Sequence, residues 1–135
     1  MGKHLLRQPK PPRPTNAELH ILRVLWQRGP STVRDVHDAL DSAKRVGYTT
    51  VLKLLQIMTA KNLVTRDASA RSHVYAATAS EETVRRRMVT DLAKRVFGGS
   101  TVRLVLHALA ATPATPPELE QIRKLLDEKK MENDK

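Results

Sequence analysis

Apolar residues recur at helical spacing over residues 16–28 and together form one face of a predicted helix. This face consists of Leu19, Ile21, Leu22, Leu25 and Trp26. Thr15 and Glu18 have the spacing of a capping box, in which a hydroxyl and a carboxylate satisfy free amides at a helix start. The dipeptide Gly-Pro at 29–30 ends the pattern. The sequence therefore predicts a helix over residues 16–28 that buries this face, with Trp26 as its anchor.

Two further helices are predicted in the next part of the chain. Thr32 and Asp35 repeat the capping arrangement before residues 33–42, whose apolar stripe consists of Val33, Val36, Ala39 and Leu40. After a loop at 43–47, the core-facing positions of the third helix are Val51, Leu54, Leu55 and Met58. Asn62 adopts the left-handed conformation at lower cost than β-branched residues, so we expect this helix to end there.

Two short β-prone runs follow the third helix, at residues 64–66 and 72–76. The polar connection between them, residues 67–71, is long for a tight hairpin. The order of helix, turn, helix and two-stranded hairpin is typical of a winged helix, in which the second helix of the helix-turn-helix lies in the major groove of DNA. We therefore expect residues 15–78 to form a DNA-binding domain.

The C-terminal third carries three more amphipathic helices, which are separated by Gly98–Gly99 and by Thr112–Pro113. Helices this short cannot bury their apolar faces alone, so we expect this part of the chain to form a homodimer. The predicted dimerisation residues are Val84, Met88, Leu92, Val96, Phe97, Val102, Val105, Leu106, Leu109, Ile122 and Leu125. The alternative, in which these helices pack on the N-terminal domain of one monomer, remains open.

The predicted fold is therefore mainly α with a small β-wing: an N-terminal winged helix-turn-helix followed by a C-terminal helical dimerisation segment. We expect four divisions, a basic proline-rich arm at 1–14, the winged helix at 15–78, the dimerisation helices at 79–130 and a charged tail at 131–135. The prolines of the arm fix φ and lack an amide donor, which excludes a helix there. Arg13 in this arm is a candidate phosphate contact, and a solvated tail is the alternative.

Charge favours a polyanionic partner, because 24 Lys and Arg against 14 Asp and Glu give a formal net charge of +10. The excess is concentrated in residues 1–75, where 13 basic and 5 acidic residues give 13 − 5 = +8. Residues 76–135 hold 11 basic and 9 acidic residues, which gives 11 − 9 = +2. With only four aromatic residues, a base-stacking platform for single strands is disfavoured, and double-stranded DNA fits better.

The candidate base-contacting residues lie at the start of the third helix, where a recognition helix meets base edges. They are Tyr48, Thr49, Thr50 and Lys53. The candidate wing contacts are Arg66, Arg71 and His73, which suit phosphate or an adjacent minor groove and position more than they specify. A solvated helix face and a solvated hairpin are the alternatives. The run 85–87 of three arginines favours solvation and local ion pairing, because consecutive helical residues point about 100° apart.

No catalytic pattern is present, neither a glycine-rich phosphate loop nor a nucleophile elbow, so we do not expect an enzyme. The five histidines form no close ligand pair, and we expect no metal and no other cofactor. The absence of cysteine excludes disulfides and thiolate metal sites. No apolar run approaches the ~18 residues of a membrane helix, and no secretory signal is found, so we expect a cytoplasmic protein.

Taken in order, several short motifs resemble the penicillinase repressor family, the BlaI and MecI type of bacterial winged-helix repressor. They are residues 16–26 (NAELHILRVLW), 32–36 (TVRDV), 48–51 (YTTV), 61–64 (KNLV), 71–75 (RSHVY), 97–100 (FGGS) and 104–106 (LVL). Each motif is weak alone, but the ordered set spans residues 15 to about 129 and is specific. Asn62 stands where many members have glycine.

The resemblance implies a homodimer on a palindromic operator, with one winged helix on each half-site. It also implies that Thr49, Thr50 and Lys53 occupy recognition-helix contact positions and that Arg71 is the basic residue of the wing. In the best-known members, repression of β-lactamase genes ends when a sensor protease triggers cleavage. The chain departs from the copper-responsive branch because it lacks that branch's cysteine cluster, and residues 92–97 do not allow a scissile bond to be transferred.

The sequence thus predicts a sequence-specific transcriptional repressor that binds operator DNA as a homodimer. Control of β-lactam resistance genes and inactivation by a sensor protease are further expectations from the resemblance. Two alternatives remain open: a basic architectural or RNA-associated protein without sequence preference, and an adaptor whose winged helix binds protein.

Overall fold

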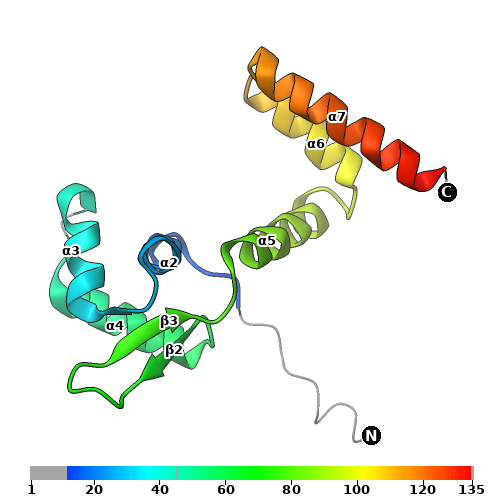
Figure 1. Ribbon diagram of the computed structural model, residues 1–135. Coiled ribbons are helices and arrows are strands. Elements are labelled where there is room, and N and C mark those ends of the chain that lie inside the picture. The colour runs from blue at the N-terminus through cyan, green and yellow to red at the C-terminus, as the bar shows by residue number, and fades with distance from the viewer. Residues whose placement is uncertain (1–11, 45, 135) are drawn as a thin grey trace, which may run out of the picture. The chain divides into compact units, whose positions relative to one another are not determined.

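The computed structural model describes residues 12–44 and 46–134 (Figure 1). Its first described helix, α2 (Asn16–Arg28), has the boundaries predicted from the sequence. The amide of Glu18 donates to Thr15 Oγ1 at 3.2 Å, and the amide of Thr15 donates to Glu18 Oε1 at 2.9 Å. At the other end, Gly29 has a φ of 87° and its amide donates to the carbonyl of Leu25. Both predicted ends of the helix are therefore confirmed.

Helix α3 (Val33–Lys44) is two residues longer than expected, and α4 (Tyr48–Ala60) follows it. The Thr32 and Asp35 cap forms as predicted, since each amide donates to the side-chain oxygen of the other residue at 3.1 Å. Together α3 and α4 make the expected helix-turn-helix, and α2 packs on α3 beside them (Figure 1).

The end of α4 is a Schellman motif with asparagine at its left-handed position. Asn62 has a φ of 63°, which confirms the predicted left-handed conformation. The amide of Leu63 donates to the carbonyl of Met58, and the amide of Asn62 donates to the carbonyl of Thr59. Leu63 and Met58 are both buried, which adds the apolar contact typical of this motif. The motif turns the chain directly from α4 into the next strand.

The wing is part of a three-stranded antiparallel sheet, whereas the sequence predicted only two strands. Its strands β1 (Ser31–Thr32), β2 (Val64–Asp67) and β3 (Val74–Ala77) are arranged in the order β1-β3-β2. Strand β1 was missed because two polar residues carry no alternating pattern. It pairs with β3 through Ser31 opposite Tyr75 and thereby joins the wing to the turn between α2 and α3.

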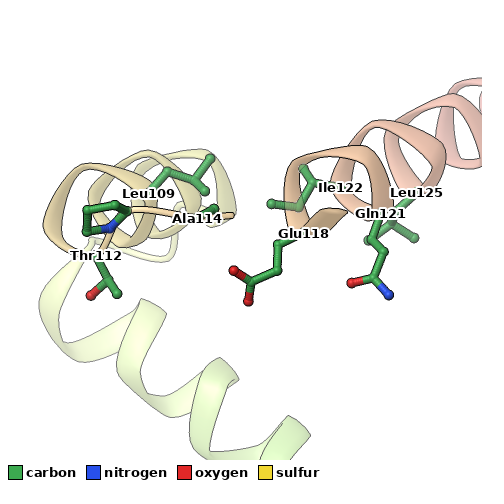
Figure 2. Close-up of a pocket in the computed structure, with 8 residues that line it drawn as sticks. Leu109, Thr112, Ala114, Glu118, Gln121, Ile122 and Leu125 are labelled. Atoms are coloured by element: carbon green, nitrogen blue, oxygen red, sulfur yellow. The ribbon is translucent and has the colours of Figure 1, made fainter. Parts of the chain in front are cut away.

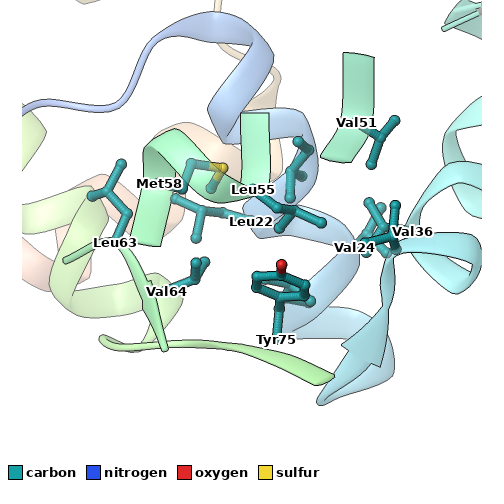
Figure 3. Packing of buried hydrophobic residues seen from close by; sticks show 12 residues of the cluster. Leu22, Val24, Val36, Val51, Leu55, Met58, Leu63, Val64 and Tyr75 are labelled. Atoms are coloured by element: carbon teal, nitrogen blue, oxygen red, sulfur yellow. The ribbon is translucent and has the colours of Figure 1, made fainter. Parts of the chain in front are cut away.

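The hydrophobic core lies where α2, α3, α4 and the sheet meet (Figure 3). Its buried residues are Ile21, Leu22, Val24, Leu25, Val33, Val36, Val51, Leu55, Met58, Leu63, Val64 and Tyr75. Leu19, Trp26, Leu40 and Leu54 are only partly buried against it. The prediction for Ala39 was wrong: this residue is exposed, because Val33, Val36 and Leu40 form the inward stripe of α3. Tyr75 adds a large aromatic side chain to the core.

Three helices follow the sheet: α5 (Glu81–Val96), α6 (Thr101–Ala111) and α7 (Pro116–Asn133). Gly98 and Gly99 both have positive φ and separate α5 from α6. Thr115 and Glu118 form the second complete capping box, and α7 continues through residue 133 into the segment expected to be a charged tail. The chain divides into two compact units between Met88 and Val89, inside α5. No helix of residues 12–44 and 46–134 is long and apolar enough to cross a membrane.

Candidate nucleic-acid interface

The first turn and a half of α4 presents the predicted base-contacting residues to solvent. Tyr48, Thr49, Thr50 and Lys53 are all exposed. The opposite side of the same helix is anchored in the core by Val51, Leu55 and Met58. The helical period therefore separates an anchoring face from a polar face, and the four candidates lie within two turns of one rigid element.

The start of α4 has an electrostatic character suited to an anion. Gly47 occupies the N-cap position and supplies no side-chain hydrogen bond, and the first turn contains no acidic residue. The leading amides of a helix lack intrahelical partners, and the helix dipole places partial positive charge there. The first turns of α2 and α7 each contain the glutamate of a capping box, Glu18 and Glu118. The first turn of α4 has no such carboxylate, so its leading amides remain available to a phosphate.

Helix α3 adds two residues that the sequence analysis did not select. The guanidinium of Arg34 lies 5.9 Å from the centroid of the Tyr48 ring, at cation–π distance. The ring of His37 meets the same tyrosine edge-on, with centroids 6.2 Å apart. The sequence could have indicated Arg34, because it lies between Val33 and Val36, whose side chains point into the core. The side chain of Arg34 therefore points away from the core. Arg34 and Tyr48 therefore form a basic and aromatic edge at the start of α4.

The wing carries the other predicted contacts. Arg66 lies on β2, whereas Arg71 and His73 lie in the connection between β2 and β3, and all three are exposed. Asp67 Oδ1 accepts a hydrogen bond from the amide of Ser69 at 2.9 Å, which folds the start of that connection. Within the described part of the chain, neither arginine forms an ion pair with a carboxylate. Their charges remain available to a partner.

Two other basic segments were noted in the sequence, the N-terminal arm and the arginine run 85–87. Arg13 is exposed just before α2, and residues 1–11 of the predicted arm lie outside the described residues. In the arginine run of α5, Arg85 pairs with Glu81 at 2.9 Å and Arg86 pairs with Glu82 at 3.0 Å. The interpretation of this run as local ion pairing is confirmed.

A buried ion pair fixes the far end of α4. The ammonium of Lys61, the C-cap residue, donates to both carboxylate oxygens of Glu18 at 3.1 and 2.9 Å. The Glu18 side chain is 2% exposed. Burial raises the pKa of Glu18, but hydrogen bonds from Thr15 and Lys61 outweigh it and hold this pKa below its usual value. One carboxylate thus caps α2 and ties its start to the end of α4.

A second surface, on α6 and α7, is apolar. Neither helix contains a buried residue, and the exposed apolar side chains are Val102, Val105, Leu106, Leu109, Leu119, Leu125, Leu126 and Met131. An open pocket of about 370 Å³ lies between the two helices. Figure 2 shows Leu109 on α6 and Ile122 and Leu125 on α7 among the side chains that line it. Among the predicted dimerisation residues on α5, Leu92 and Val96 are exposed, whereas Val84 is already buried within its own chain.

Comparison with known proteins places this architecture in a family. The model of the penicillinase repressor family matches residues 14–128. The chain is also 35% identical over 113 residues to the transcriptional regulator BlaI of Mycobacterium tuberculosis (strain ATCC 25618 / H37Rv), with 82% of this chain and 80% of that protein covered. This chain belongs to the penicillinase repressor family. The resemblance suggested by the sequence motifs is therefore confirmed.

Members and structures of the penicillinase repressor family from other bacteria are more distant. The chain is 19% identical over 112 residues to the penicillinase repressor of Staphylococcus aureus, covering 83% of this chain and 89% of that protein. It is similar to the solution structure of monomeric BlaI of Bacillus licheniformis in complex with the blaP half-operator, with 22% identity and a TM-score of 0.48. That similarity covers 54% of this chain and 89% of the other.

Proposed function

We propose that this protein is a transcriptional repressor that binds a palindromic DNA operator as a homodimer. The observation that carries the proposal is the polar, uncapped start of α4, where Thr49, Thr50 and Lys53 project from a helix held in the core. Thr hydroxyls and a Lys ammonium supply the donors that base edges in the major groove accept. Membership of the penicillinase repressor family supports the same function.

In this proposal the two parts of the surface have different roles. The α4 residues contact bases, because a helix of this width fits the major groove and its N-terminal side chains reach the base edges. Arg34, Arg66 and Arg71 contact phosphates, which supply affinity without sequence information. The free amides at the start of α4 add a further phosphate site.

The uncovered apolar surface of α6 and α7 supports the proposed dimerisation. Short helices obtain most of their stability from packing an apolar face, and monomeric soluble proteins rarely expose large contiguous apolar patches. Every apolar side chain of α7 outside its partly buried Ile122 is exposed in the single chain. A second copy of the same helices would cover these side chains and hold two winged helices together on one operator.

The proposal also includes control of β-lactam resistance genes and release of DNA by proteolysis, which are supported by the family resemblance. A membrane metalloprotease gene next to the gene of this protein would support a protease-triggered release. Measuring the length of this chain before and after β-lactam exposure of its host would test that release directly.

The proposal is tested by selecting duplexes from a pool of random sequence with the full-length protein. We expect enrichment of an inverted repeat, to which Lys53→Ala then binds about 5- to 150-fold more weakly, as expected for loss of a good base contact worth about 1 to 3 kcal/mol. Fluorescence anisotropy at several salt concentrations measures the affinity. Lys124→Ala, an exposed lysine of α7, is the matched control and should bind as the unmodified protein does.

The other possible outcomes correspond to the two alternative functions. Salt-dependent binding without enrichment of any sequence would instead indicate an architectural protein. No salt-dependent binding at all would indicate an adaptor for other proteins. Unchanged operator affinity of Lys53→Ala would contradict the role assigned to this lysine.

A further inference from the structure

The ring of Tyr48, the first residue of α4, is held by two side chains of α3. The guanidinium carbon of Arg34 lies over the ring, 5.9 Å from its centroid. The imidazole of His37 meets the same ring at an interplanar angle of 60°, with the two centroids 6.2 Å apart. Arg34 and His37 are three positions apart and therefore lie on one face of α3. This face supports the side chain with which α4 begins.

The backbone on both sides of these contacts is fixed. Arg34 lies in the first turn of α3, where Thr32 and Asp35 exchange their two capping hydrogen bonds at 3.1 Å. On α4, Val51 lies about one turn after Tyr48 and is buried in the core. The two helices pack on each other within the winged helix. The position of the Tyr48 ring therefore depends on its own side-chain torsions.

The contacts with α3 restrict those torsions. A tyrosine that is 45% exposed, as Tyr48 is, would otherwise sample several staggered rotamers. The His37 ring is itself oriented, because its Nδ1 lies 3.2 Å from Asp38 Oδ1 and its side chain is only 23% exposed. A cation over the face of an aromatic ring and a second ring against it each favour the rotamer that makes the contact. Tyr48 is therefore set in one orientation before any partner binds.

Arg34 keeps its hydrogen-bond donors while it covers the ring. A guanidinium is planar, so that one face can lie against an aromatic ring while the N–H groups at its edge remain available to a phosphate. Among the described side chains, no carboxylate forms an ion pair with Arg34. The phosphate contact proposed above and the contact with Tyr48 are therefore compatible in one side chain.

We propose that Arg34 and His37 are positioning residues: they hold the Tyr48 ring in one orientation, and this orientation gives Tyr48 its base preference within the half-site. The inference rests on the proposed function, because it requires α4 to contact bases. A side chain that rotates freely contacts several bases about equally well. One that is held in advance loses less conformational entropy on binding and discriminates between them. In this role neither α3 residue contacts a base.

The experiment uses full-length protein and the selected palindrome, in which each base pair of one half-site is replaced in turn. Fluorescence anisotropy measures the penalty, which is the factor by which a replacement weakens binding. Tyr48→Ala identifies the base pair that depends on the tyrosine, because the penalty at that base pair shrinks. Arg34→Met and His37→Gln then remove the two α3 contacts separately. Circular dichroism checks that each variant is folded.

We expect the unmodified protein to show a penalty of about 5- to 150-fold at that base pair. The penalty should shrink about 2- to 5-fold in Arg34→Met, the size of one exposed cation–π contact, and about 2- to 10-fold in His37→Gln. Penalties at the other base pairs should keep their values. In the Tyr48→Ala background neither substitution should lower the penalty further, because no ring remains to be held.

Arg66→Met is the matched control, because it makes the same replacement at an exposed arginine of β2. Loss of a phosphate contact should weaken binding to every duplex of the panel by a similar factor and reduce the salt dependence. The penalty at each base pair should therefore keep the value of the unmodified protein. The difference between Arg34→Met and Arg66→Met separates positioning of the ring from the loss of a charge.

Three results would overturn the inference or the function beneath it, and they differ from each other. Penalties that keep their values in both α3 variants, with or without a uniform loss of affinity, mean that the contacts do not set the base preference. A Tyr48→Ala protein with unchanged penalties, while Lys53→Ala lowers one, means that Tyr48 reads no base. Unmodified protein without a penalty at any base pair means that the proposed sequence-specific function itself is wrong.

Discussion

Helix α2 and the last two helices carry similar apolar stripes, but the structure uses them in different ways. In α2 the stripe is buried by other elements of the same chain, with Ile21 and Leu22 almost fully inaccessible. In α6 and α7 no residue is buried. The comparison shows that helical periodicity identifies an apolar face without identifying what covers it. In the winged helix the cover is intramolecular, and in α6 and α7 we propose a second copy.

The largest expected effect comes from placing a charge on the exposed apolar surface. Leu106 on α6 is 61% exposed in the single chain. Leu106→Glu should yield a monomer in sedimentation equilibrium and weaken binding to the selected palindrome by at least about 100-fold, because the second half-site loses its effective concentration. The circular dichroism of the winged helix should persist.

Gln27→Glu is the control for that substitution, since it adds the same charge at an exposed position of α2. It should remain dimeric and bind the palindrome to within a few-fold. A Leu106→Glu protein that stays dimeric would show that this part of α6 is not covered by a second copy.

The buried ion pair of the winged helix gives the next largest effect. Lys61→Met removes the ammonium that satisfies both oxygens of buried Glu18. The free energy of unfolding should fall by about 2 kcal/mol, as expected when a hydrogen-bonded buried charge loses its partner. Urea denaturation without DNA measures the change.

Lys53→Met is the matched control, because it makes the same replacement at an exposed position of the same helix. Its stability should change by less than about 0.5 kcal/mol. Equal effects of the two substitutions would mean that the pair with Glu18 contributes nothing specific.

Lowering the pH should remove the stability that this ion pair contributes to the unmodified protein. Because the folded pKa of Glu18 is lowered, the unfolded state binds its proton first as the pH falls. The contribution of Glu18 is therefore complete above its ordinary pKa of about 4.3 and is lost as the pH falls through the lower folded pKa. Urea midpoints between pH 7 and pH 3 should fall less steeply for Glu18→Gln. Parallel profiles would contradict the assignment.

The smallest effect is expected at the left-handed end of α4. Asn62→Ala should lower the free energy of unfolding by about 1 kcal/mol, because a Cβ-bearing residue without a short polar side chain is strained at a φ of 63°. Asn62→Gly is the control and should be neutral or slightly stabilising, since glycine adopts this conformation without strain. Thermal and urea unfolding measure both, and a destabilised glycine variant would show that the asparagine side chain itself is needed.

Local patterns predicted most of the elements that form the candidate site. The capping pairs marked the starts of α2 and α3, and Asn62 marked the end of α4, because caps depend on residues within a few positions of each other. The exposed face of α4 followed from its helical period. The order of these elements indicated a winged helix, and the ordered set of short motifs indicated the penicillinase repressor family.

The tertiary structure decided which distant residues meet. Strand β1, the packing of Arg34 against Tyr48, the pairing of Glu18 with Lys61 and the bond from Trp26 to Ala79 all join separate elements. The pairing and the bond link residues 43 and 53 positions apart, so no short-range period or cap encodes them. The sequence determines which side chains share each face of a helix, because helical periodicity depends only on residues a few positions apart. Which group covers each face depends on how the whole chain packs, and for α6 and α7 we propose that a second chain covers it.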